Sequence, residues 1–178
     1  MGEFLTYKVR CQDYYKDLKL VVDNVLYQDD DGSIYLVPRN FVTDLYSIPN
    51  IFAFVVGDSA GRDTRPSIIH DFGCAYHKLI KVDLTKEQLK KIGYLREHYS
   101  QEQQATITVC EDIPTCYLSF KKVTKGSIND IFGRMMDCLK IDKRGLIRAG
   151  VAFNFNFYFK KYPYTLLDCY RITNHYER

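Results

Sequence analysis

Residues 25–37 read VLYQDDDGSIYLV, and this stretch contains a complete strand–turn–strand unit. Two runs rich in β-branched and aromatic residues flank Asp29–Gly32, which is typical of a turn because glycine adopts a positive φ without steric cost. Pro38 ends the second run, since proline cannot donate a hydrogen bond to a β-ladder. The stretch therefore predicts an antiparallel hairpin, which the runs Leu5–Val9 and Leu18–Val22 extend into a small N-terminal meander.

The clearest helical pattern lies at residues 127–140, where apolar residues recur with the period of an amphipathic helix. These apolar residues are Ile128, Ile131, Phe132, Met135, Met136 and Leu139. Ser127 is the predicted N-cap of this helix. Asp130 then falls at the N3 position of a capping box, with Arg134 one turn later as its ion partner.

Three further helices are predicted. Thr64 as an N-cap indicates a helix that ends near residue 78. Thr85 followed by Gln88 is a capping-box pattern that opens a helix reaching about residue 99. Another helix is expected over 143–153, after which residues 153–159 alternate phenylalanine with other residues at the period of a strand.

Between the predicted helices at residues 85–99 and 127–140 we expect a second hairpin. It would pair Ala105–Val109 with Cys116–Phe120 around a turn near Pro114. The predicted fold class is therefore α+β, a single domain over residues 1–178 in which a small antiparallel β-meander packs on three or four helices.

Composition narrows the classes of function. The chain has 25 basic and 22 acidic residues, and a net charge of +3 is too balanced to indicate nucleic-acid binding. Neither a membrane-spanning run nor a signal peptide is expected. The six cysteines form no CxxC pair, so reduced thiols are expected, although Cys110 and Cys116 could face each other across a turn as thiols or as a disulfide. The 15 tyrosines and 11 phenylalanines without tryptophan suit subunit interfaces, or equally reflect codon bias in an AT-rich genome.

Two motifs carry ionisable residues at the ends of predicted elements. Residues 37–49 read VPRNFVTDLYSIP, and residues 70–74 read HDFGC. These motifs resemble those of an uncharacterised phage and prophage family, a domain of unknown function whose members share VPxGFxTDxxSIP and HDxLY segments. Asn40 replaces the usual glycine, and asparagine is the next best residue for a left-handed turn. Cys74 replaces the family tyrosine, and Asn129 replaces a small residue in a later motif.

The resemblance covers residues 18–80 and 127–153, so residues 81–125 are predicted to be an insertion within a family-like core. Its hairpin is expected to pack on a neighbouring subunit or on the helices of the domain itself. The resemblance implies a phage-encoded protein without an established activity. We therefore expect a non-enzymatic virion protein of the tail or neck, made in the host cytoplasm and assembled with other phage structural proteins, including copies of itself.

The alternative is a phage-encoded hydrolase directed at the cell wall. Its candidate catalytic residues are His70, Asp71, Asp44 and Asp130, because a histidine beside carboxylates can activate a water molecule. The same residues also fit a structural network, in which Asp44 satisfies the amides of a turn and Asp130 caps a helix.

A zinc site is a second chemical possibility. His70, Cys74 and His77 are spaced to share one face of a helix, and imidazole and thiolate ligands suit zinc. Three ligands on one regular helix span about 10 Å, so an ion would bridge the first pair more readily than all three. Apart from this possible zinc ion, no cofactor is expected.

Overall fold

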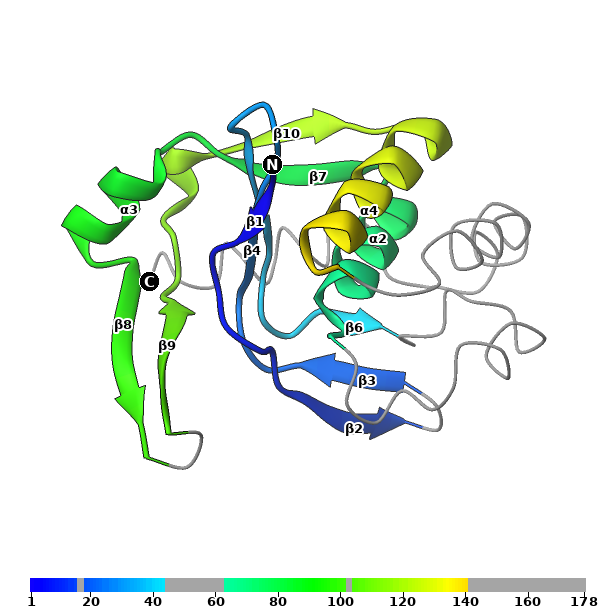
Figure 1. The fold of residues 1–178 in the computed structure, drawn as a ribbon. Coiled ribbons are helices and arrows are strands. Elements are labelled where there is room, and N and C mark those ends of the chain that lie inside the picture. The colour runs from blue at the N-terminus through cyan, green and yellow to red at the C-terminus, as the bar shows by residue number, and fades with distance from the viewer. Residues whose placement is uncertain (16–17, 44–62, 102–103, 141–178) are drawn as a thin grey trace.

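The computed structural model describes residues 1–15, 18–43, 63–101 and 104–140. Within these residues the chain forms a five-stranded antiparallel main sheet with two helices on one face, together with two smaller sheets (Figure 1). The strands of the main sheet, in spatial order, are β1 (Glu3–Phe4), β4 (Val25–Gln28), β5 (Ile34–Val37), β7 (Lys78–Val82) and β10 (Leu118–Lys122). The α+β prediction is confirmed.

The smaller sheets lie beside the main one. The first contains β2 (Cys11–Tyr15), β3 (Leu18–Val21) and β6 (Val42–Thr43), and the second contains β8 (Leu95–Ser100) and β9 (Ala105–Cys110). The helices are α2 (Arg65–Tyr76), α3 (Lys86–Ile92) and α4 (Lys125–Cys138), with the short 3₁₀ turn η1 (Thr115–Tyr117) before β10. Among the described residues, no helix is long and apolar enough to cross a membrane.

The predicted β4–β5 hairpin is confirmed, and both of its strands lie inside the core. Gly32 has a φ of 81° and donates its N–H to the carbonyl of Asp29, so the turn uses glycine as expected. Seven residues of the two strands are buried: Val25, Leu26, Tyr27, Ile34, Tyr35, Leu36 and Val37. Asn40 has a φ of 69°, which confirms the left-handed turn predicted where the family motif has glycine.

Helices α2 and α4 pack closely on each other and on the main sheet. A Cβ atom at Gly73 would lie 2.6 Å from Cδ1 of Ile128 and 3.4 Å from Leu79 on β7. Side chains from both helices join the buried core, including Ile68, Ile69 and Phe72 from α2 and Ile128, Ile131, Phe132, Met135 and Met136 from α4. The apolar stripe predicted at residues 127–140 is therefore the core face of α4.

Several helix boundaries differ from the prediction. Thr64 makes no side-chain capping bond at the start of α2. Thr85 and Gln88 do form the predicted capping box, but α3 ends at Ile92 because Gly93 adopts a left-handed conformation there. The N-cap of α4 is Thr124, whose hydroxyl accepts the Ser127 N–H, so Ser127 occupies N3 and is not the cap.

The prediction that residues 105–123 form a hairpin is wrong. β9 pairs with β8 in the register Leu95 to Cys110, while β10 pairs with β7 in the main sheet. The charged run of β8 resembled the continuation of a helix, so its pairing with β9 was missed. The strand predicted at residues 5–9 is not formed. Strand β1 ends before it, at Phe4, and β2 begins after it, at Cys11.

The predicted insertion, residues 81–125, includes the end of β7 and all of β10, which belong to the main sheet. Within this segment, α3, the β8–β9 hairpin and η1 lie outside that sheet (Figure 1). Whether a core made of residues 18–80 and 127–153 folds alone stays a prediction. The expected helix at 143–153 and strand at 153–159 lie outside the described residues.

Candidate functional site

His70 lies in the second turn of α2 and is 3% exposed. Its Nε2 atom is 2.9 Å from Oδ1 of Asn129 on α4. Because an amide oxygen only accepts, Nε2 carries the proton and donates this hydrogen bond. The imidazole also packs against Phe132, with 4.8 Å between the ring centroids. The histidine therefore joins α2 to α4 through one polar and one apolar contact.

The adjacent carboxylate of Asp71 extends this connection to β6. Its Oδ1 atom is 3.8 Å from Nδ1 of His70, which is an ion-pair distance longer than a hydrogen bond. Its Oδ2 atom accepts a 2.5 Å hydrogen bond from the hydroxyl of Thr43, a fully buried residue of β6. A polar chain thus runs from Asn129 through His70 and Asp71 to Thr43.

The thiol of Cys74 contacts the same imidazole from one turn further along α2. Its Sγ atom lies 3.8 Å from Nδ1 and 3.7 Å from Nε2. A sulfur atom this evenly placed in the ring plane would overlap Cε1, so it lies over the face of the ring. Proton transfer or a shared metal ion needs an approach along a nitrogen lone pair. The Cys74 sulfur therefore contacts the face of the ring, where it acts on the imidazole electrostatically and not through a shared proton.

The charge state of His70 follows from its neighbours. Burial favours the neutral ring and by itself lowers the pKa of His70, but Asp71 and Cys74 outweigh burial and raise the pKa to about 10. The imidazole is consequently a cation at neutral pH. A protonated ring of this kind holds carboxylates in place, but it does not accept a proton from water.

Of the three candidate catalytic residues that the structure describes, it brings His70 and Asp71 together. Asp44 lies outside the described residues. Asp130 is exposed on α4, and the capping role predicted for it is wrong because Ser127 occupies the N3 position. Its predicted ion partner, Arg134, binds Asp29 instead.

The structure places the three candidate zinc ligands differently from the prediction that they share one helix face. His77 is the exposed C-cap residue of α2 and has a φ of 53°, so it has left the regular helix on which the prediction depended. Cys74 lies over the ring of His70, away from the lone pairs. Across the part of the chain that the structure describes, no three His, Cys, Asp or Glu side chains are close enough to hold one metal ion.

Asn129 and Thr43 belong to the polar chain but were not predicted as members of the site. A signal for Asn129 exists in the sequence, because it is three residues before Phe132 and seven before Met136, at the edge of the apolar stripe. A polar side chain in that position faces a neighbouring element. Thr43 gives no such signal, since its contact with Asp71 depends on how β6 packs against α2.

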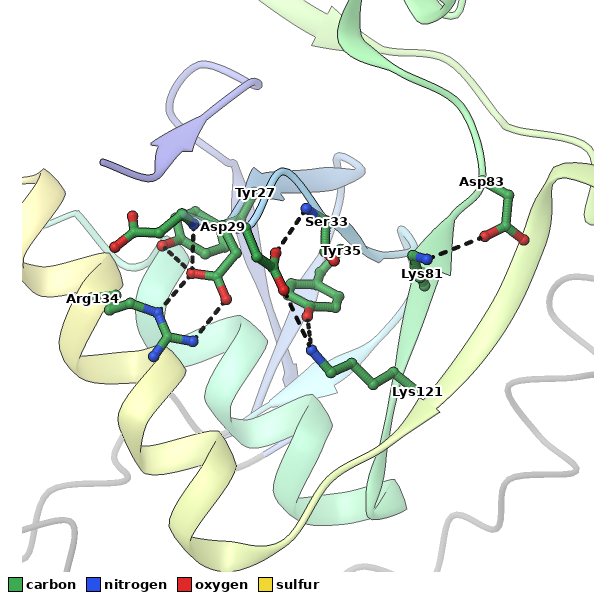
Figure 2. Close-up of polar contacts among 10 residues, drawn as sticks. Tyr27, Asp29, Ser33, Tyr35, Lys81, Asp83, Lys121 and Arg134 are labelled. Atoms are coloured by element: carbon green, nitrogen blue, oxygen red, sulfur yellow. Dashed lines mark hydrogen bonds and ion pairs between the residues drawn. The ribbon is translucent and has the colours of Figure 1, made fainter.

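A second polar cluster connects the β4–β5 turn to α4 (Figure 2). The Arg134 guanidinium donates to both carboxylate oxygens of Asp29, each at 2.7 Å, and the Tyr27 hydroxyl donates to Oδ1 at 3.2 Å. Burial alone raises the pKa of Asp29, but the bonds from Arg134 and the Asp30 N–H outweigh it and hold the pKa below its usual range. The hydrogen-bond partners in this cluster are residues of the chain itself, so the cluster stabilises the fold.

Residues 20–146 match a family described as "Protein of unknown function (DUF1353)". The matched segment contains both polar clusters and the whole of residues 81–125. No curated protein and no solved structure matches the chain.

Proposed function

The chain belongs to this family, DUF1353, and we propose that it is a non-enzymatic structural protein of a bacteriophage particle, built into the tail or neck. The phage assignment rests on the resemblance of residues 37–49 and 70–74 to phage and prophage motifs. Its partners are other structural proteins of the particle, including further copies of this chain. The protein is made in the host cytoplasm and ends in the virion.

The observation that carries this proposal is the β8–β9 hairpin, residues 95–110, which projects from the body of the domain (Figure 1). Four consecutive residues of β8, Arg96 to Tyr99, are exposed, so both faces of this strand are open to solvent. Tyr99 is 63% exposed. A two-stranded ribbon is marginal alone in water, and docking against a neighbouring subunit would bury these faces.

The base of the hairpin is held firmly by contacts with the rest of the domain. Leu95 is buried, the Asn24 amide donates to the Cys110 carbonyl at 3.2 Å, and the Tyr7 N–H donates to the Thr108 carbonyl at 2.7 Å. A fixed base gives this hairpin, hereafter the arm, one orientation relative to the rest of the domain. Such preorganisation lowers the entropic cost of docking, as an assembly contact requires.

A variant without the arm tests this role. Because Leu95 and Cys110 are directly paired, an Asn-Gly turn can replace residues 96–109 and leave the main sheet intact. We expect this variant to fold, as judged by circular dichroism, and to be absent from phage particles purified on a density gradient. Incorporation of the arm-less protein at the wild-type level would contradict the assembly role of the hairpin.

The hydrolase remains the alternative function, and one observation keeps it testable: His70 and Asp71 adjoin each other where β6 leads into residues 44–62. His70→Gln retains a buried hydrogen-bonding side chain and removes the imidazole. For a structural protein we expect particles that contain this variant to remain infectious. Loss of infectivity with normal folding and normal incorporation would instead favour chemistry at His70.

A further inference from the structure

Strand β8 is the outer strand of the arm. Among the described strands only β9 pairs with it, and in Figure 1 β9 lies between β8 and the rest of the domain. Arg96, Glu97, His98 and Tyr99 are exposed one after another along β8. An edge strand presents backbone N–H and C=O groups to which a further strand can pair.

Two backbone hydrogen bonds show which residues of β8 direct these groups outward. The Tyr94 carbonyl, just before β8, accepts the Glu111 N–H at 2.8 Å, so the even-numbered residues bond to β9. The Thr108 carbonyl of β9, opposite an odd-numbered residue of β8, accepts the Tyr7 N–H at 2.7 Å and so points away from β8. The odd-numbered residues of β8 therefore direct their N–H and C=O groups to the outer edge.

We propose that this edge pairs with β8 of a second copy of the chain, antiparallel and about a two-fold axis through His98. Glu97 of each copy then lies opposite Tyr99 of the other, and each of these pairs exchanges both of its outward N–H···O=C bonds. The two arms form one continuous sheet in the order β9, β8, β8, β9.

The side chains on one face of the arm fit this pairing. Tyr99 is 63% exposed, and the pairing places its ring beside Glu97 of the other copy. That carboxylate accepts a 2.7 Å hydrogen bond from the Lys90 ammonium of α3, and the Glu97 and Lys90 side chains are 50% and 46% exposed. Their aliphatic stems offer the incoming ring an apolar surface, and the ammonium group offers it a cation–π contact.

The other symmetric registers are less favourable. Outward-facing residues must meet outward-facing residues, so the axis has to pass through a residue of the strand. An axis through Glu97 or Arg96 would place two like charges directly opposite each other, which destabilises a sheet. An axis through Tyr99 would pair only residues 98–100 of the strand, whereas the axis through His98 pairs residues 96–100.

This inference rests on the proposed role of the arm in assembly and names its partner, but the two are tested separately. The arm-less variant reports on entry into the particle, whereas dimerisation is measured on the purified protein. A monomeric wild type, with an arm-less variant that is excluded from particles, would keep the assembly role and overturn this partner. A dimer, with an arm-less variant that enters particles, would keep the contact between copies and overturn the assembly role.

Sedimentation equilibrium over a range of protein concentrations tests the pairing. The contact is small, so we expect a dimer dissociation constant on the order of 0.1 mM. His98→Glu places two carboxylates opposite each other at the axis and should raise this constant at least about tenfold. Thr106→Glu is the matched control, because Thr106 is exposed on β9, one strand further from the axis, and it should leave the constant nearly unchanged. A wild-type chain that stays monomeric at millimolar concentration, or equal effects of the two variants, would overturn the proposal.

Disulfide cross-linking tests the register. The axis makes His98 and its counterpart a non-hydrogen-bonded pair, in which the Cα atoms are about 4.5 Å apart, within the range that a disulfide spans. His98→Cys, made together with Cys116→Ser to remove an exposed thiol, should therefore give a linked dimer under mild oxidation. Glu97→Cys and Thr106→Cys in the same background should stay monomeric on a non-reducing gel. A linked dimer from either of these two variants, with none from His98→Cys, would contradict the inference.

Discussion

At the scale of single residues, His70 determines how the two core helices are joined. Its ring is almost completely buried, yet it is held as a cation by Asp71 and bonded to Asn129. Removing it leaves the Asn129 amide oxygen without its donor and opens a gap beside Phe132. We expect His70→Ala to lower the free energy of unfolding by roughly 1–3 kcal/mol.

The pH dependence of stability gives a sharper test of the His70 cation. The pKa of His70 is raised from 6.5 to about 10 in the folded protein, so folding takes up a proton between these values. The stabilisation is complete below about pH 6.5 and is lost as the pH rises toward 10. Urea unfolding of the wild type and of His70→Gln should therefore give a difference that narrows across this window.

A substitution that removes no ionisable group supplies the control for that experiment. The difference in the free energy of unfolding between the wild type and Gly126→Ala should stay nearly constant from pH 6.5 to 10. A His70→Gln difference that is flat, or that grows with pH, would contradict the cationic assignment of His70.

At the scale of elements, the contact between α2 and α4 depends on a glycine. A Cβ atom on Gly73 would lie 2.6 and 2.8 Å from two carbons of Ile128, so this side chain, itself 1% exposed, would have to shift within the packed core. We expect Gly73→Ala to lower the free energy of unfolding by about 1–2 kcal/mol, because overpacking outweighs the gain in helix propensity. Thermal unfolding measured by calorimetry checks this value.

The matched control lies in the first turn of α4. A Cβ atom on Gly126 would meet only the Thr124 hydroxyl, at 3.9 Å. Gly126→Ala should therefore leave stability unchanged or raise it by up to about 1 kcal/mol. Equal losses from the two substitutions would show that glycine is needed for the helix backbone and not for the packing of α2 on α4.

Some helices and strands could be predicted from the sequence, and others could not. Some elements depend on residues that are close together in the sequence, so their patterns can be recognised there. They are the β4–β5 hairpin, α2, the capping box of α3 and the apolar stripe of α4. The pairing of β8 with β9, and of β10 with β7, depends on which strand edges meet after collapse. A strand such as β8, with four charged or polar residues out of six, carries no apolar alternation to reveal it.

The candidate site was also predictable only in part. His70 and Asp71 were identified because they are adjacent in one motif. Their partners Asn129 and Thr43 come from elements 59 and 28 residues away, so only the packed fold brings them together. The carboxylate of Asp130 suggests chemistry in the sequence, whereas in the structure the neutral amide of the neighbouring Asn129 accepts the histidine proton.

At the scale of the whole molecule, the side-chain hydrogen bonds with the greatest sequence separation among the described residues join the turn of the β4–β5 hairpin to α4. Asp29 and Arg134 are 105 residues apart, and they meet through two hydrogen bonds of 2.7 Å (Figure 2). The Asp29 side chain is 2% exposed, whereas the Arg134 side chain is 36% exposed and can be hydrated if it loses its partner. The carboxylate is therefore the member of the pair that depends on the contact.

We expect Asp29→Asn to lower the free energy of unfolding by about 1.5–3 kcal/mol, because the amide loses one charge-assisted bond to Arg134. Asp30→Asn, in the same turn, affects a half-exposed side chain whose printed ion pair is to the N-terminal amine at 3.8 Å, and should change the free energy of unfolding by less than about 0.5 kcal/mol. The pKa of Asp29 is lowered by folding, so its contribution is present at neutral pH and is lost as the pH falls through that lowered pKa. Urea unfolding at pH 7 and at pH 3 should therefore show a difference between wild type and Asp29→Asn that shrinks in acid. A difference that is already absent at pH 7 would mean that the turn and α4 are held together by apolar packing alone.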